Sequence, residues 1–144
     1  MVEKNFQSMF SKWVLDNLPK KSTTWELKLE KGTAMPFDRV YAHQVKGLND
    51  SKYEGLYHKI SDSPIFPGSK IRFTKPKPCD CVFLKDADAF VVLLFYRPRQ
   101  EKEMIFIDVD AWKNEKFNSM RKSITEKRAK EISSKVIVLE NKYK

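Results

Sequence analysis

A carboxylate and an ammonium group stand two residues apart in the segment Trp25-Glu26-Leu27-Lys28. The alternation of apolar and charged residues over 25–30 predicts a β-strand that buries Trp25 on one face and presents Glu26 and Lys28 side by side on the other. In this arrangement the carboxylate can hold a divalent metal ion while the lysine orients an attacking water and offsets the charge of a phosphorane. A solvated strand face carries the same residue types, so the spacing alone leaves both interpretations open.

Two segments that follow this strand make the pattern more specific. They are Met35-Pro36-Phe37 and His43-Gln44-Val45-Lys46-Gly47-Leu48. In order and spacing, residues 25–48 resemble the PD-(D/E)xK nuclease superfamily, particularly its resolvase-like bacterial and phage branch related to RecU. The resemblance implies a restriction-endonuclease-like fold, hydrolysis of branched DNA with release of a 5′-phosphate, and a homodimer.

The family pairs its glutamate with a second acidic residue, which normally precedes it. Residues 19–25 contain no Asp or Glu, whereas Asp80 in Lys77-Pro78-Cys79-Asp80 resembles the Pro-Asp element of the family. The motif order would then be permuted. The resemblance therefore implies that Asp80 and Glu26 hold Mg²⁺ or Mn²⁺, with the carbonyl of Leu27 as a further ligand. The alternative for Asp80 is a turn-forming residue before a strand.

Three more residues match positions that the family uses around its metal. Glu3 resembles a helix-borne acid that some members add to the site, although a glutamate in a first helical turn is also favoured by the helix dipole. Gln44 is expected to hydrogen-bond the catalytic Lys28 or a metal-bound water, and His43 to reach a DNA phosphate. Both also fit an ordinary helix surface.

The charge balance points to a polyanionic partner. The chain has 28 Lys+Arg against 19 Asp+Glu, which gives a net charge of +9, and folded basic domains commonly bind nucleic acid. We interpret four cations as solvating the last predicted helix: Lys122, Lys127, Arg128 and Lys130. The cations predicted to contact DNA phosphates are Lys20, Lys21, Lys31, Arg39, Lys70, Arg72, Lys75 and Lys77.

Other candidate sites are weaker. Asp108 and Asp110 could replace Asp80 as metal ligands, or they could form a strand end followed by a capped turn. Cys79 and Cys81 are too close in sequence for an ordinary disulfide and too few for a structural zinc site. The four glycines are scattered singly, which excludes kinase and dinucleotide-binding loops.

With 144 residues and 41% hydrophobic side chains, the chain predicts one α/β domain over residues 1–144, with a mixed central sheet flanked by helices. No segment reaches the ~18–20 apolar residues of a membrane span. The lack of a signal peptide predicts an intracellular protein of a bacterial or phage-infected cell. The expected elements are helices at 3–18, 36–48 and 123–132, strands at 25–30, 55–60, 104–109 and 135–139, a loop at 61–79, and a hairpin of 81–85 with 89–97.

The expected function is Mg²⁺-dependent hydrolysis of branched or structured DNA, in the manner of a Holliday-junction resolvase. A non-catalytic nucleic-acid-binding module on the same fold is the first alternative. The second is a protein-interaction factor whose positive charge serves solubility.

Overall fold

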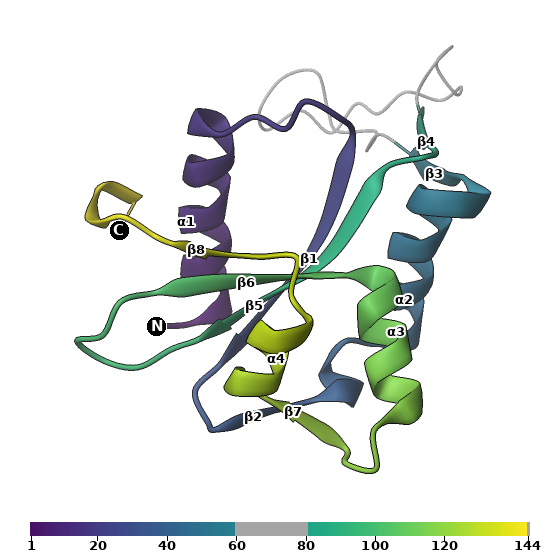
Figure 1. Cartoon of the computed structure of the whole chain (residues 1–144). Coiled ribbons are helices and arrows are strands. Elements are labelled where there is room, and N and C mark those ends of the chain that lie inside the picture. The colour runs from purple at the N-terminus through teal and green to yellow at the C-terminus, as the bar shows by residue number, and fades with distance from the viewer. Residues whose placement is uncertain (60–80, 144) are drawn as a thin grey trace, which may run out of the picture.

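A four-stranded mixed sheet forms the centre of the molecule (Figure 1). The computed structural model describes residues 1–59 and 81–143. In the order β1-β5-β6-β8, β1 runs parallel to β5, and the other neighbours are antiparallel. The predicted α/β class, with one domain and a mixed sheet between helices, is confirmed for these residues. The strands are β1 (Thr23–Glu30), β5 (Asp88–Phe95), β6 (Glu103–Asp108) and β8 (Lys135–Val138).

Helices cover both faces of this sheet. On one face α1 packs through Phe6, Phe10 and Trp13 against the even-numbered side chains of β5 and β6. On the other face α2, α3 and α4 pack against the odd-numbered side chains of the same two strands, from Ala89 to Ile107. The helices are α1 (Glu3–Asp16), α2 (Ala42–Asn49), α3 (Val109–Asn118) and α4 (Glu126–Ile132), with shorter turns η1 (Phe37–Arg39), η2 (Asp50–Glu54) and η3 (Asn141–Tyr143).

The alternation in β1 assigns its two faces to these two layers. Trp25 and Leu29 belong to the α1 layer, where the Trp25 ring lies 5.3 Å from that of Phe10. Parallel pairing sets Glu26 opposite Val91 and Lys28 opposite Leu93, both of which belong to the α2 layer. The predicted strand is therefore confirmed, and its two charged residues face α2.

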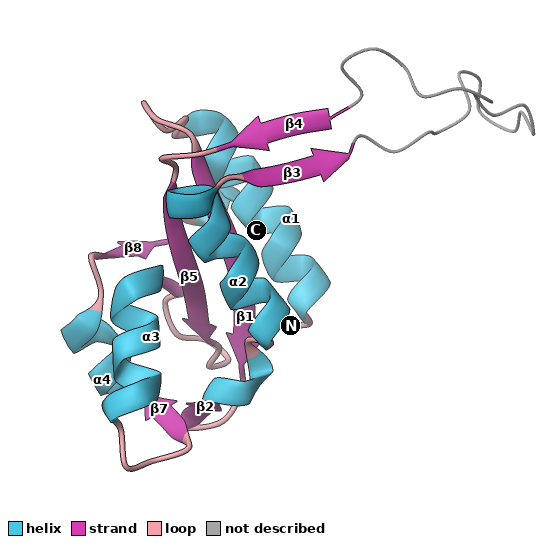
Figure 2. Cartoon of the chain, turned by 90° about the vertical axis from the view of Figure 1, so that its right-hand side faces the viewer, coloured by secondary structure: helices cyan, strands magenta, loops and turns pink. Residues whose placement is uncertain are grey.

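Two small sheets extend the fold. β2 (Ala34–Pro36) pairs with β7 (Ser123–Thr125), and β3 (Leu56–Lys59) pairs with β4 (Cys81–Leu84). The β3–β4 pair projects from the body as an arm (Figure 2). Gly55 begins this arm at φ +101°, and a Cβ there would lie 2.5 Å from the Phe83 ring. Only glycine meets both conditions without strain.

The predicted helix over 36–48 is wrong in its first part. Pro36 has an extended backbone and pairs with Ser123 in the β2–β7 sheet, and Tyr41 is extended as well. The regular helix α2 therefore begins only at Ala42. The partner strand that holds Pro36 lies far along the chain, so helical periodicity could not show the interruption.

The predicted hairpin of 81–85 with 89–97 is also wrong, although both strands exist. β4 pairs with β3 in the arm, whereas β5 pairs with β1 and β6. Asp86 turns the chain at φ 57°, and the buried Ala87 donates its N–H to the carbonyl of Ser51. These contacts direct β5 into the central sheet instead of back along β4.

The remaining differences concern helix ends. The first helix ends at Asp16 and not at the expected residue 18, and Leu18 is 71% exposed. Residues 109–118 form the regular helix α3 where only a capped turn was expected. Among the described residues, no helix has the length and hydropathy needed to cross a membrane.

Candidate functional site

The centre of β1 presents a short network of contacts to α2. The Lys28 ammonium lies 3.1 Å from Glu26 Oε1, and Gln44 Nε2 donates to the same oxygen at 2.8 Å. Glu26 and Lys28 come from one strand face, and Gln44 comes from the first turn of the helix that follows in the chain. The structure thus brings together three of the four residues to which the sequence assigned a catalytic role.

The start of α2 fixes the orientation of Gln44. The Gln44 side-chain oxygen accepts a hydrogen bond from the Tyr41 backbone N–H at 2.9 Å. Since that N–H can only donate, the amide nitrogen of Gln44 must face Glu26, whose carboxylate can only accept. A hydrogen bond from the N-cap backbone to the side chain of the third helical residue is a capping interaction. Here it also orients the Gln44 amide N–H toward the Glu26 carboxylate.

Lys28 is buried although it carries a charge. Its exposed fraction is 7%, and within the described part of the chain it is the one charged residue in the buried class. The ammonium lies 5.5 Å from the centre of the Tyr41 ring, which stacks in turn on His43 at a ring separation of 5.7 Å. Desolvation of an ammonium costs free energy, which the Glu26 contact and the Tyr41 ring offset. Sequence reasoning missed Tyr41.

A second ionic group lies farther along the same strand face. Arg39 donates to Glu30 Oε2 at 2.8 Å and lies 3.8 Å from Glu3 Oε2. Glu30 is four residues beyond Glu26, about 13 Å along the strand. The structure thus places Glu3 beside Arg39, outside the contacts of Glu26, and Arg39 itself is held in an ion pair.

The basic residues predicted to contact DNA fall into two groups. Lys20 and Lys21 precede β1, Lys31 follows it, and His43 lies at the start of α2; all four are exposed. Lys21 makes a 3.4 Å contact with Asp88. The other predicted contacts, Lys70, Arg72, Lys75 and Lys77, lie outside the described residues, as does the proposed metal ligand Asp80.

The donor chemistry of the site fits a hard divalent cation. The Glu26 side chain contacts two described residues, Lys28 and Gln44, and both contacts are made by Oε1. Oε2 is therefore left for a ligand. Mg²⁺ is commonly held by one or two carboxylates together with water and substrate phosphate. In the described part of the chain, no set of three or more Asp, Glu, His or Cys side chains is arranged to hold a metal. The second ligand expected from the sequence, Asp80, lies outside the described residues.

Asp108 and Asp110 are engaged in another way. Asp108 caps α3 by accepting from the Asp110 N–H at 2.9 Å, and Lys52 lies 3.0 Å from Asp108 and 2.8 Å from Asp110. Burial disfavours the charged forms, but hydrogen bonds outweigh it, raising the pKa of Lys52 and lowering that of Asp110. The hydrogen bond to Asp110 also raises the pKa of Tyr53. These contacts favour the interpretation as a capped strand end over that as metal ligands.

Replacing Lys52 tests this ionic group. We expect Lys52→Ala to lower the free energy of unfolding by about 1 kcal/mol, because two adjacent carboxylates lose their shared cation. Lys46→Ala is the matched control: Lys46 pairs with Asp50 at 2.5 Å but is 74% exposed, so its loss should stay below about 0.5 kcal/mol. Urea denaturation followed by circular dichroism measures both.

The same group predicts a pH dependence. Because the pKa of Asp110 is lower in the folded chain, its contribution is present above the ordinary pKa of an aspartate and is lost as pH falls through the folded value. Lys52→Ala should therefore flatten the acid side of the stability profile. An unchanged acid profile would show that the pair contributes nothing.

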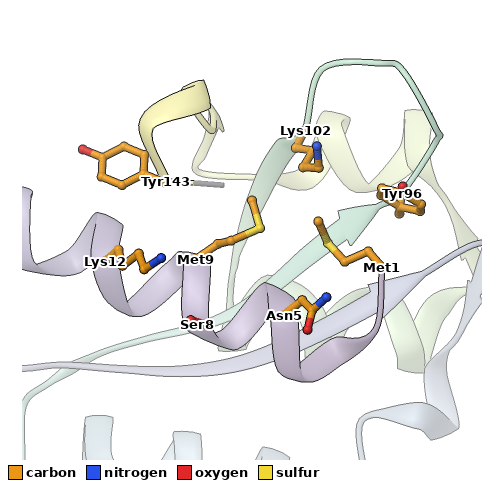
Figure 3. A pocket seen from close by; sticks show the side chains of 8 residues that line it. All are labelled: Met1, Asn5, Ser8, Met9, Lys12, Tyr96, Lys102 and Tyr143. Carbon is orange, nitrogen blue, oxygen red and sulfur yellow. The ribbon is translucent and has the colours of Figure 1, made fainter.

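A cavity of about 460 Å³ lies on the opposite side of the sheet, between α1, the ends of β5 and β6, and η3 (Figure 3). Lys12 and Met9 of α1 line it together with Tyr96, Lys102 and Tyr143. None of its lining residues belongs to the Glu26–Lys28–Gln44 network. The candidate site lies on the other face of the sheet, where the start of α2 covers Glu26 and Lys28.

Comparisons with protein-family models, with curated proteins and with solved structures find no match to this chain.

Proposed function

We propose that this protein is a metal-dependent endonuclease that hydrolyses phosphodiester bonds in branched or structured DNA. The observation that carries the proposal is the buried Lys28, held between the carboxylate of Glu26 and the ring of Tyr41. A lysine that served only solubility would remain in water, where its charge costs nothing. Burying an ammonium beside a carboxylate on a strand is costly for stability and useful for chemistry on a phosphate.

Each residue of the network has a role in this proposal. Lys28 donates a hydrogen bond to the attacking water or to a phosphate oxygen and offsets the charge that develops there. Gln44 holds the Glu26 side chain in one orientation, so that Oε2 faces the ligand. A Mg²⁺ or Mn²⁺ ion held by Glu26, Asp80 and the carbonyl of Leu27 would activate the water and polarise the phosphate.

The resemblance of residues 25–48 to the PD-(D/E)xK nucleases supports the same function, and with it a restriction-endonuclease-like fold in permuted motif order. The connection from β1 through α2 to the parallel β5 is compatible with that fold. Symmetric cutting of two strands implies a homodimer, which light scattering on the purified chain can test.

Cleavage of a labelled four-way DNA junction tests the proposal. We expect the full chain to cut the junction with Mg²⁺, to stop when EDTA is added, and to lose cleavage in Glu26→Gln and in Asp80→Asn. Glu101→Gln and Asp86→Asn are matched controls: both residues are exposed, and asparagine tolerates the positive φ at 86. Cleavage that survives Glu26→Gln would contradict the assigned site.

A non-catalytic nucleic-acid-binding module is the second candidate. It is favoured by the net charge of +9 and by the lack of a complete metal-ligand set among the described residues. This candidate predicts junction binding that weakens steeply with salt, no cleavage with Mg²⁺ or Mn²⁺, and equal binding by wild type and Glu26→Gln.

A further inference from the structure

The last turn of α3 and the connection from α3 to β7 expose two large apolar side chains, Phe117 and Met120. Phe117 is 88% exposed and Met120 is 101% exposed, the highest values among large hydrophobic residues in the described part of the chain. Single exposed apolar residues are common on protein surfaces. Here, however, two of them stand three residues apart in a basic segment, Lys116-Phe117-Asn118-Ser119-Met120-Arg121-Lys122. Its first three residues end α3 and its last four connect α3 to β7. We call this whole segment the 116–122 loop.

Hydrogen bonds tie this loop to the body of the protein. The Ser119 N–H donates to the Glu115 carbonyl at 2.9 Å, and the Arg121 N–H donates to Ser119 Oγ at 3.1 Å. At its far end the carbonyl of Lys122 accepts from the Phe37 N–H at 3.0 Å. These hydrogen bonds therefore fix the backbone that carries the two exposed apolar side chains.

The charge around the loop is positive. Lys116, Arg121 and Lys122 are exposed, and the loop contains no acidic residue. The adjacent Glu115 accepts from Nε and Nη2 of Arg128, at 3.0 Å each, while Lys116 lies 3.5 Å from Asp38. Lys122 precedes α4, so the prediction that it solvates the last helix is wrong. Exposed apolar side chains flanked by cations are chemically complementary to nucleic-acid bases flanked by phosphates.

The loop also lies at the end of the molecule that holds the candidate site. Its contact with Phe37 joins it to η1, which leads within a few residues to Tyr41 and the start of α2. Both overall views show the α3–β7 connection and the N-terminal end of α2 at the same end of the protein (Figures 1 and 2). The loop is therefore joined, through η1, to the segment that leads into the helix covering the candidate site.

We propose that the 116–122 loop is a DNA wedge, in which Phe117 and Met120 enter an opened base step while Arg121 and Lys122 contact the flanking phosphates. Phenylalanine and methionine are among the side chains that proteins insert between bases, where they unstack a step and kink the duplex. A branch point, whose bases are already partly unstacked, costs least to open. The inference rests on the proposed function: the wedge is the part of the protein that would distinguish branched DNA from linear DNA.

Junction opening can be measured apart from cleavage. The probe is a four-way junction with 2-aminopurine at the branch point, mixed with the full chain in Ca²⁺ in place of Mg²⁺. We expect wild type to raise the fluorescence by unstacking the probe. Phe117→Ala/Met120→Ala should abolish the increase and weaken junction binding by about tenfold, since base stacking on an apolar side chain is worth a factor of this order.

Leu15→Ala/Leu18→Ala is the matched control, because these residues are 73% and 71% exposed and lie at the end of α1. This variant should open and bind the junction as wild type does. Arg121→Gln/Lys122→Gln should instead lower the slope of log K against log salt by about 2, as expected for two lost phosphate contacts. Phe117→Ala/Met120→Ala should leave that slope unchanged.

Four results would overturn the wedge. They are unchanged fluorescence and affinity in Phe117→Ala/Met120→Ala, an equal loss in the Leu15→Ala/Leu18→Ala control, conversion of a dimer to a monomer by the loop variant, and loss of its binding to phosphatidylserine vesicles without loss of junction opening. Junction opening by a wild-type chain that never cleaves would contradict the nuclease and leave the wedge standing. Cleavage by a wild-type chain that does not open the junction would contradict the wedge and leave the nuclease standing.

Discussion

Lys28→Met is expected to lower the rate of junction cleavage by about 10²–10³-fold while leaving junction binding nearly unchanged. The substitution keeps the length and apolar stem of the side chain but removes the ammonium that lies 3.1 Å from Glu26 Oε1. A group that acts on developing charge contributes mainly in the transition state, so its loss should appear in kcat more than in KM.

The Glu26–Lys28 pair should behave as a unit. We expect Glu26→Gln/Lys28→Met to be no slower than the slower of the two single variants, because each single change already disables the same step. Single-turnover cleavage rates of the four chains form the required double-mutant cycle. Fully additive effects would show that the two residues act independently.

Lys127→Met is the matched control for lysine replacement, since Lys127 is exposed on α4. It should cleave at the wild-type rate. Lys28→Met should remain folded, because a methionine fills the buried volume without a desolvated charge. A Lys28→Met chain that is folded and fully active would remove Lys28 from the mechanism.

Trp112→Ala is expected to lower the free energy of unfolding by about 3–5 kcal/mol. Trp112 has no exposed surface, belongs to the core between the sheet and helices α2–α4, and packs edge-on against Phe37 at 5.3 Å. Since a domain of this size is stabilised by about 5–15 kcal/mol in total, this single change removes a large part of its stability. Urea denaturation gives the value directly.

Trp112→Phe should cost far less than Trp112→Ala. The indole Nε1 is buried and has no hydrogen-bond partner among the described residues, and a buried donor without a partner costs about 1–3 kcal/mol. Phenylalanine removes that donor while keeping most of the ring volume, so the two effects largely cancel. Equal losses in the two variants would show that the indole nitrogen is satisfied in solution.

Phe117→Ala on the same helix is the matched control for the loss of an aromatic side chain. Because Phe117 is 88% exposed, its replacement should change the free energy of unfolding by less than about 0.5 kcal/mol. A larger loss would show that Phe117 is buried in solution, and that result would also contradict its assignment to a DNA wedge.

Strand positions were predictable from the sequence because alternation, as in 25–30, and short apolar runs, as in 104–109, are local properties. The apolar residues of 25–30, 104–109 and 135–139 predicted β1, β6 and β8 within a residue or two. The helix expected over 123–132 exists as α4, but it begins at Glu126, where the Thr125 side chain caps it by accepting from the Arg128 N–H. Local hydrogen bonding and side-chain periodicity suffice for such elements.

Pairing partners were not predictable in this way. β5 was expected to fold back on β4, but the buried Ala87 and its contact with Ser51 direct it to β1. Pro36 was expected to open a helix, but Ser123 holds it in a strand. In both cases a partner distant in sequence decides the outcome, because backbone pairing joins residues that no local periodicity relates.

The candidate site likewise has features that depend on local sequence and features that depend on tertiary packing. The sequence by itself determined that Glu26 and Lys28 share one face of a strand, since alternation in a β-strand leaves no other choice. Only the tertiary structure decided that α2 covers that face, that Gln44 donates to Glu26, and that Lys28 is buried against Tyr41. The physical reason is that the face on which a side chain lies depends on the backbone of its own strand. The burial of that side chain, and the partner to which it bonds, depend on how the strand packs against a second element.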